Sequence, residues 1–298
     1  MAWFEGFTAQ KFAVNGIEVF ARFGGDRSKP AVLLLHGFPQ SHVMWHRVAQ
    51  QLAKDFFIVM PDLRGYGDSS KPLATPEHAQ ASKRVMAQDM VDVMTTLNRE
   101  QFYLCGHDRG GRVAHRLALD HPRKVPKLCV IDIAPTLDMY AATDMAFARA
   151  YYHWFHLIQP TPLPERMIHS DWKNYLHAKL GGWGSAGLAY IEPEALAEYE
   201  RCFAQMATTH AMCEDYRASA GIDLAHDKDS RAKGHKIACD TLVLWGERGV
   251  VQRMFQPLAL WQAQCSAIVT GQAVPAGHFI TEELVQTTSE QLSLFFKA

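Results

Sequence analysis

The sequence predicts an α/β fold whose sheet is mostly parallel and covered by helices on both faces. In the first third of the chain, short runs of β-branched and aliphatic residues alternate with helix-like stretches. A later stretch is aromatic, rich in methionine and free of a convincing strand pair. The 298 residues suffice for one large domain that buries about three quarters of its unfolded surface.

Eight segments have the composition of strands, because they concentrate aliphatic, β-branched and aromatic residues between turn residues. They are Phe12–Val14, Glu18–Arg22, Ala31–Leu35, Phe56–Met60, Phe102–Cys105, Leu128–Ile131, Thr241–Trp245 and Ala267–Thr270. A closing helix is expected from about Thr281 to Phe296. The sequence therefore predicts an eight-stranded sheet followed by a C-terminal helix.

The aromatic stretch lies between the sixth and seventh of these strands. Its helical pattern is interrupted by Pro160, Pro162, Pro164 and Gly181-Gly182. Open α/β sheets bind ligands at the carboxyl ends of their strands, and an insertion after a central strand would cover that edge. We therefore expect a core formed by residues 1–135 and 237–298, with a helical cap formed by residues 136–236.

Composition and charge exclude several classes of protein. The 30 basic and 31 acidic residues give a net charge of -1, which argues against a nucleic-acid partner. The longest apolar run, Ala31–Leu35, is far shorter than the ~20 residues of a membrane span, and the N-terminus lacks signal-peptide features. The six cysteines form no CxxC pair. We expect a soluble cytoplasmic protein that acts on a small molecule.

A strand-to-helix turn at Gly106-His107-Asp108-Arg109-Gly110 carries the main chemical signal. Glycines on both sides of a central residue allow the sharp turn called a nucleophile elbow. An aspartate that merely caps the following helix is the alternative. Capping does not explain the paired glycines, so we interpret Asp108 as a nucleophile.

Further motifs complete a family resemblance over nearly the whole chain. They are His36-Gly37-Phe38-Pro39, the turn from Asp62 to Ser69, the elbow itself and Gly277-His278-Phe279. Together they resemble the α/β-hydrolase superfamily, in its aspartate-nucleophile branch. The segments Tyr151–Pro160 and Cys213–Ala218 are similar to cap motifs of fluoroacetate dehalogenases. This resemblance implies an α/β-hydrolase fold, hydrolysis of haloacetates such as fluoroacetate, and a homodimer.

An aspartate nucleophile restricts the reaction. Asp108 is ionised at pH 7 and can displace a leaving group from saturated carbon, forming an ester that water then hydrolyses. His278, on a loop after the last strand, fits the base that activates this water. Asp132, at the end of the sixth strand, is the expected partner of His278, with Glu247 as the alternative. Backbone N–H groups of Phe38 and Arg109 are the expected oxyanion donors.

Arg109 and Arg112 lie on one face of the helix that follows Asp108. Cations at a helix N-terminus oppose the macrodipole, so an anion must compensate them. Asp108, another protein carboxylate or the substrate could do so. We favour the substrate, because guanidinium groups bind a carboxylate bidentately. The two arginines thus predict a 2-halocarboxylate.

The resemblance assigns a halide pocket to His153, Trp154 and Tyr216, whose N–H and O–H groups are compact donors. These residues could instead belong to the packing face of the cap, as we expect for Phe147, Tyr151, Phe155 and Ile158. Trp183 is expected to line an entrance. His153 and His156 lack further ligands at metal spacing, and no phosphate-binding or dinucleotide motif occurs, so neither metal nor cofactor is expected.

Two other functions remain open at this point. An epoxide hydrolase would use the same nucleophile and would need a cap tyrosine such as Tyr152 or Tyr216 to protonate the epoxide oxygen. A relative that binds ligands without turnover would not need the set Asp108, His278 and Asp132. The complete set argues against the second alternative.

Overall fold

The computed structural model describes residues 2–298. Its sheet has eight strands in the order β1-β2-β4-β3-β5-β6-β7-β8. Pairings β1–β2 and β2–β4 are antiparallel and the rest are parallel, so the predicted mostly parallel, eight-stranded sheet is confirmed. The strands are β1 (Phe7–Val14), β2 (Ile17–Gly24), β3 (Ala31–Leu35), β4 (Phe57–Pro61), β5 (Tyr103–His107), β6 (Lys127–Ile131), β7 (Asp240–Gly246) and β8 (Val269–Val274).

The register of the central strands determines where the site forms. β3 and β4 are buried along their whole length, as parallel strands covered on both faces are. Leu35 pairs with Gly106, and His107 pairs with Ile131. Strands β3, β5 and β6 therefore end at the same edge of the sheet, and the residues that follow them emerge there together.

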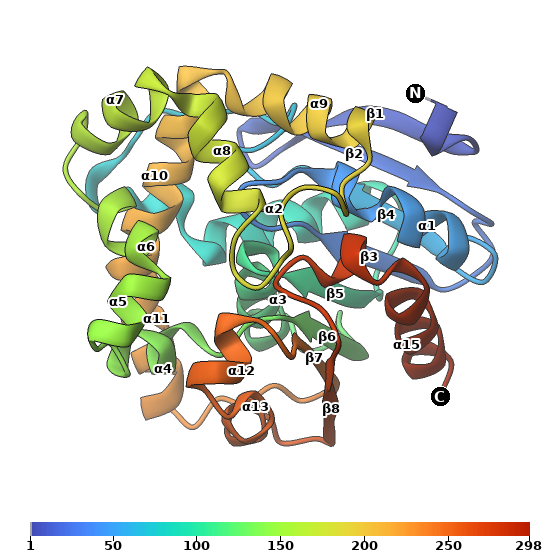
Figure 1. The fold of residues 1–298 in the computed structure, drawn as a ribbon. Helices are drawn as coiled ribbons and strands as arrows, with labels where there is room; N and C mark the ends of the chain where they lie inside the picture. Colours follow the sequence, from blue (N-terminus) through green and yellow to red (C-terminus); the bar gives the residue numbers. More distant parts are fainter. Residues whose placement is uncertain (1) are drawn as a thin grey trace.

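Helices outside the long insertion cover the two faces of the sheet. Helix α1 packs against α15 and helix α2 packs against α3, and Figure 1 shows these pairs on opposite sides of the sheet. Their bounds, with those of the shorter helices, are α1 (His46–Leu52), α2 (Lys83–Thr96), α3 (Arg109–Asp120), α12 (Val250–Met254), α13 (Pro257–Gln264), α14 (Ile280–Glu283) and α15 (Val285–Lys297). Three short 3₁₀ helices are η1 (Ala2–Phe4), η2 (His42–Trp45) and η3 (Pro76–Ala81).

The insertion between β6 and β7 is helical among the described residues. Figure 1 shows its helices in green to light orange, along the left and top of the molecule. They are α4 (Thr136–Ala141), α5 (Met145–Ala150), α6 (Tyr152–Leu157), α7 (Leu163–Ser170), α8 (Trp172–Leu180), α9 (Pro193–Phe203), α10 (Met206–Ala220) and α11 (Ile222–Ala232). The predicted prolines fall between α6 and α7 and in the first turn of α7, where no backbone donor is lost.

The structure corrects three predicted elements, all at the periphery. Strand β1 begins at Phe7 rather than Phe12, because the exposed residues at its start give no hydrophobic signal. Strand β8 spans Val269–Val274 rather than Ala267–Thr270, for the same reason at the opposite edge of the sheet. The closing helix is two helices, interrupted at Leu284 (φ −134°, ψ 60°). Glu283, before the break, accepts hydrogen bonds from backbone N–H groups of the loop that carries His278.

Candidate active site

A sharp turn between β5 and α3 presents Asp108. This residue has φ 46° and ψ −116°, a conformation that strains a non-glycine residue. A Cβ on Gly106 would lie 2.4 Å from the carbonyl oxygen of Gly110, and a Cβ on Gly110 would lie 2.4 Å from that of His36. Both flanking positions therefore require glycine, and the turn has the geometry of a nucleophile elbow.

The backbone around Asp108 holds its carboxylate in place. The N–H of Phe38 donates to Oδ1 of Asp108 at 2.9 Å. Arg109 is the first residue of α3, so its N–H is one of the donors that have no acceptor within the helix. Of the two predicted oxyanion donors, the N–H of Phe38 therefore contacts the Asp108 side chain, and the N–H of Arg109 lies at the start of α3.

His278 and Asp132 lie next to Asp108. Nδ1 of His278 is 2.6 Å from Oδ2 of Asp132, and Nε2 of His278 is 3.9 Å from Oδ2 of Asp108. Asp132 Oδ1 also accepts a hydrogen bond from the N–H of Gly246 at 2.9 Å. The alternative partner, Glu247, is exposed. The structure therefore brings together the three residues that the sequence selects.

Burial and neighbouring charges determine the protonation states of Asp108 and His278. Burial raises the pKa of the Asp108 carboxyl, but nearby His278, His107 and the two arginines outweigh burial and hold the pKa below its ordinary value. Burial lowers the pKa of His278, whereas the hydrogen bond and charge of Asp132 raise it to a net value above the ordinary one. Asp108 is therefore an anion at neutral pH, and His278 is a better proton acceptor than a free imidazole.

The side chain of Arg109 is paired with a protein carboxylate. Its Nε lies 3.0 Å from Oδ2 of Asp215, and its Nη2 donates to Oδ1 of Asp215 at 2.5 Å and to Ser219 Oγ at 2.6 Å. Lys83 and Tyr66 also donate to Asp215. Of the three anions that could offset the charge of Arg109, the structure shows another protein carboxylate, that of Asp215. Nη1 of Arg109 has no partner.

Arg112 differs from Arg109, because no salt bridge reaches it within the described residues. It is 3% exposed, and its Nη1 donates to Ala134 O at 3.3 Å and to Thr136 Oγ1 at 2.8 Å. Its guanidinium carbon lies 4.8 Å from the ring centre of Trp154. A buried cation that forms no salt bridge is costly, so Arg112 is suited to hold an anionic ligand.

The predicted halide residues meet above the elbow. The His153 ring is stacked on Phe38 at 5.7 Å between ring centres and lies 5.6 Å from Tyr216. Tyr216 in turn lies 6.5 Å from Trp154. All three residues are at least 98% buried. Burial, with the charge of Lys179 second, lowers the pKa of His153 well below its ordinary value. His153 is thus a neutral imidazole with one N–H to donate.

Several buried polar atoms in this region have no partner. They are Nη1 of Arg109, Nε of Arg112, Nδ1 of His153 and the hydroxyls of Tyr140 and Tyr216. Buried polar groups are normally paired, and unpaired ones cluster where a ligand or water completes them. All five groups can donate, so the region is suited to a small anion rather than a neutral, apolar ligand.

Comparison with known proteins fixes the family. The sequence model of the α/β-hydrolase fold matches residues 30–283. The chain belongs to the α/β-hydrolase family. It is 42% identical to fluoroacetate dehalogenase of Burkholderia sp over 98% of this chain and 94% of that protein, which confirms the predicted resemblance. Soluble epoxide hydrolase of Corynebacterium sp. strain C12 is 29% identical over 89% of each chain.

Solved structures agree with this assignment. A crystal structure described as an α/β hydrolase of Nostoc sp PCC 7120 has a TM-score of 0.95 and 50% identity, over 98% of this chain and 99% of that chain. A ligand-free structure of the epoxide hydrolase CorEH has a TM-score of 0.86 and 27% identity, over 98% and 99% of the two chains. The predicted α/β-hydrolase fold is therefore confirmed.

Sequence reasoning missed one residue near the candidate site of this α/β hydrolase. Asp215, the partner of Arg109, stands directly before Tyr216 in the segment that carries the resemblance, and that adjacency was the available signal. Tyr151 is buried in the hydrophobic core and packs on Phe147, as predicted for the packing stripe. Its ring also lies 5.5 Å from that of His153 and 5.7 Å from that of Trp154. Tyr152, by contrast, is 48% exposed and stands outside the group.

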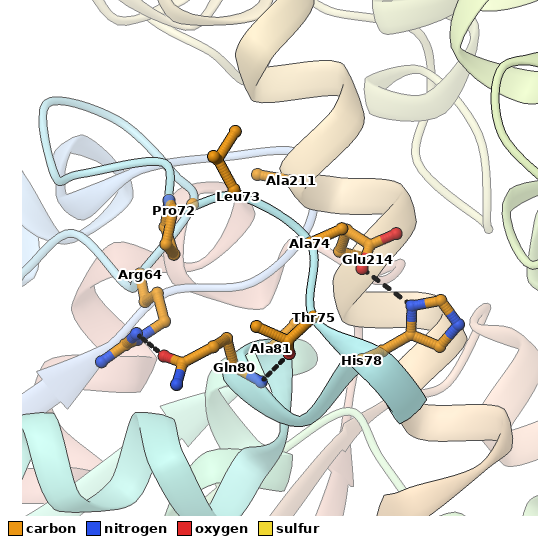
Figure 2. A pocket seen from close by; sticks show the side chains of 11 residues that line it. Arg64, Pro72, Leu73, Ala74, Thr75, His78, Gln80, Ala81, Ala211 and Glu214 are labelled. Atoms are coloured by element: carbon orange, nitrogen blue, oxygen red, sulfur yellow. Dashed lines mark hydrogen bonds and ion pairs between the residues drawn. The ribbon is translucent and has the colours of Figure 1, made fainter.

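Three further observations concern the molecule outside the candidate site. Among residues 2–298, no three His, Cys, Asp or Glu side chains group as a metal site, and no helix is long and apolar enough to cross a membrane. Figure 2 shows a surface hollow of about 20 Å³ lined by residues that include Arg64, His78 and Glu214. It is roughly large enough for one or two waters and contains none of the predicted site residues.

Proposed function

We propose that this hydrolase cleaves the carbon–halogen bond of haloacetates, and that it converts fluoroacetate and water to glycolate, fluoride and a proton. The observation that carries the proposal is the buried Arg112 guanidinium, which forms no salt bridge within the described residues and lies near the ionised Asp108. A substrate carboxylate would supply a salt-bridge partner and hold the α-carbon near Asp108. The likeness to fluoroacetate dehalogenase supports the same substrate class.

In the first step, an oxygen of Asp108 attacks the α-carbon while the carbon–halogen bond breaks. The electron pair of that bond leaves with the halide, and Asp108 becomes an ester of glycolate. In this proposal His153, Trp154 and Tyr216 donate N–H and O–H hydrogen bonds to the halide and stabilise the charge that develops on it; the proximity of their rings supports this role. Arg112, assisted by Nη1 of Arg109, holds the carboxylate end.

In the second step, His278 takes a proton from water, and the resulting hydroxide adds to the ester carbonyl carbon of Asp108. Asp132 stabilises the imidazolium that forms. The N–H groups of Phe38 and Arg109 stabilise the oxyanion of the tetrahedral intermediate. Collapse of this intermediate breaks the bond between the carbonyl carbon and the glycolate oxygen, and the imidazolium of His278 gives its proton to that oxygen. The new Asp108 carboxyl then loses its proton to solvent, which regenerates the carboxylate.

Trapping the ester tests the proposal. The variant His278→Asn keeps the nucleophile but lacks the base, so fluoroacetate should leave a covalent ester on Asp108 that intact mass spectrometry and peptide mapping detect. The double variant Asp108→Ala/His278→Asn is the matched control and should remain unmodified. An unmodified His278→Asn protein, when the wild type releases fluoride, would contradict the covalent route.

An epoxide hydrolase is the second candidate, favoured by the unpartnered hydroxyl of Tyr216 next to the nucleophile. That hydroxyl could protonate an epoxide oxygen, and epoxide hydrolases are among the relatives. A carboxylate-free epoxide that turns over faster than fluoroacetate would favour this reading. A relative that only binds ligands would show a thermal shift with haloacetates and no product.

Three coarser expectations from the sequence belong to the same proposal. Residues 136–236 act as a cap that contributes His153, Trp154 and Tyr216 to a site whose reacting groups belong to the core. The protein forms a homodimer in the cytoplasm. Light scattering of the purified chain would test the dimer.

A further inference from the structure

Lys179, near the end of α8, is a buried lysine that the proposed reaction does not use. It is 5% exposed and forms no salt bridge within the described residues. Its ammonium nitrogen lies 3.8 Å from the ring centre of Tyr152, 5.0 Å from that of Tyr175 and 5.6 Å from that of Trp183. Three aromatic faces therefore surround this cation in place of a carboxylate.

The aromatic rings around Lys179 do not fully replace the interactions that its ammonium group loses on burial. Aromatic faces attract a cation but replace only part of the hydration that burial removes. Burial lowers the pKa of Lys179 to about 8, so the side chain is mostly charged at pH 7. Nearby, the hydroxyl of Tyr175 and both ring nitrogens of His156 are buried without a partner. Within the part of the chain that the structure describes, no carboxylate pairs with Lys179, and Glu165, whose charge acts on His156, is paired with Arg217 and His210. Tyr175 and His156 therefore have free groups that can bind an added anion.

The cluster stands between solvent and the candidate active site. Tyr152, on one side of Lys179, is 48% exposed. Trp183, on another side, is half-buried, and its ring lies 4.8 Å from that of His153 and 5.3 Å from that of His278. A single indole ring thus separates the ammonium group from the groups that are proposed to receive halide and to activate water.

The loop that carries Trp183 is held against the core. Trp183 has φ 53°, a strained value for a bulky residue, and its Nε1 donates to Ala150 O at 3.2 Å. A Cβ on Gly184 would lie 2.3 Å from the carbonyl oxygen of Arg248. Figure 1 shows this loop, between α8 and α9, reaching across to the segment after β8. The loop that carries Trp183, which lies between Lys179 and the candidate active site, is therefore held in one position by its contacts.

We propose that Lys179, together with Tyr175 and His156, forms a second anion-binding site that holds a small monovalent anion just outside the catalytic pocket. The anion is the carboxylate of an incoming haloacetate or the departing halide. The identity of these anions rests on the proposed function, whereas anion binding itself requires no turnover. Lys179 touches the anion at this outer site and takes no part in bond breaking.

Bromide and acetate are the two probes. Crystals of the full chain soaked in sodium bromide should show an anomalous peak beside Lys179 in the wild type and in Lys179→Arg, and none there in Lys179→Met. In solution, the bromide dissociation constant measured by tryptophan fluorescence should rise about tenfold in Lys179→Met, equal to the loss of roughly 1.4 kcal/mol. Lys173→Met is the matched control, because Lys173 is an exposed lysine of the same helix that pairs with Glu200.

The two sources of the anion give different results. If the site captures substrate, acetate competes with bromide there and Lys179→Met loses kcat/KM for fluoroacetate at constant kcat. If it releases halide, acetate does not compete and Lys179→Met shows altered inhibition by added halide. Either result supports the outer site.

The absence of bromide beside Lys179 in the wild type, with Lys179→Met indistinguishable from Lys173→Met, would overturn the inference. Fluoride release in that case would leave the proposed function intact. Bromide at Lys179 in a protein that releases no halide from any haloacetate would contradict the proposed function and leave the outer anion site standing.

Discussion

The strand ends of the core and the aromatic part of the insertion contribute to one site in different ways. In the core, Asp108, His278 and Asp132 each have a partner within 2.9 Å. In the insertion, His153 and Tyr216 each keep a buried polar atom without a partner. The core therefore holds the proposed reacting groups in place without a ligand, whereas the insertion keeps donors available for one. Changes to the two regions should fail in different ways.

The largest effect on rate is expected from Asp132→Asn. The change removes the carboxylate that orients His278 and should lower kcat about 10³-fold. In the wild type, activity should be lost as pH falls through a His278 pKa above the ordinary 6.5, because the base must be neutral. Without Asp132, this acidic limb should move to lower pH. A pH–rate profile measures both effects, and an unmoved limb would show that Asp132 does not set the basicity of His278.

A change in the charged cluster behind Arg109 should affect stability. Asp215→Asn leaves the buried Arg109 without its carboxylate and leaves Lys83 with only Asp223, at 3.5 Å. The substitution should lower the free energy of unfolding by about 3 kcal/mol. Urea denaturation measures the loss. Asp229→Asn, which removes an exposed carboxylate paired with Lys233, is the control and should change little. Equal stability of both variants would mean that the cluster does not hold Arg109.

Arg112→Met should lower activity rather than stability, because within the described part of the chain Arg112 forms no salt bridge that the change would remove. We expect kcat/KM for fluoroacetate to fall about 10²-fold while the melting temperature stays the same or rises. Arg116→Met is the matched control. Arg116 lies on the same helix with 2% exposure but pairs with Asp227 and Asp120, so its loss should lower stability and spare activity. A marked loss of stability in Arg112→Met would indicate a structural cation.

The smallest effect is expected within the insertion. Tyr216→Phe removes one hydroxyl, which should lower kcat for fluoroacetate about tenfold and for chloroacetate about two- to threefold, because fluoride is the poorer leaving group. Parallel halide-release assays measure this selectivity. Tyr103→Phe, in β5 and stacked on Phe296, should leave both rates unchanged. An equal loss with both substrates would argue that Tyr216 positions the substrate instead of stabilising the halide.

The sequence predicts the buried centre of the sheet better than its edges. The buried strands β3 to β6, the paired glycines at the elbow and the location of Asp132 after β6 were all accessible from local patterns. Edge strands β1 and β8 were misplaced because exposure removes the hydrophobic alternation on which strand prediction depends. The interruption at Leu284 has no residue signal such as proline or glycine.

Local sequence patterns sufficed to identify the turn that carries Asp108, the candidate base and the family, because these depend on turn chemistry and residue order over a few neighbouring positions. Three-dimensional packing revealed that Arg109 is paired with a carboxylate and that Arg112 forms no salt bridge within the described residues. The same packing surrounds Lys179 with the aromatic rings of Tyr152, Tyr175 and Trp183. The partners concerned are far apart in the chain, Lys83 and Asp215 being 132 residues apart. Charge compensation between such distant residues is settled by packing, which no local pattern encodes.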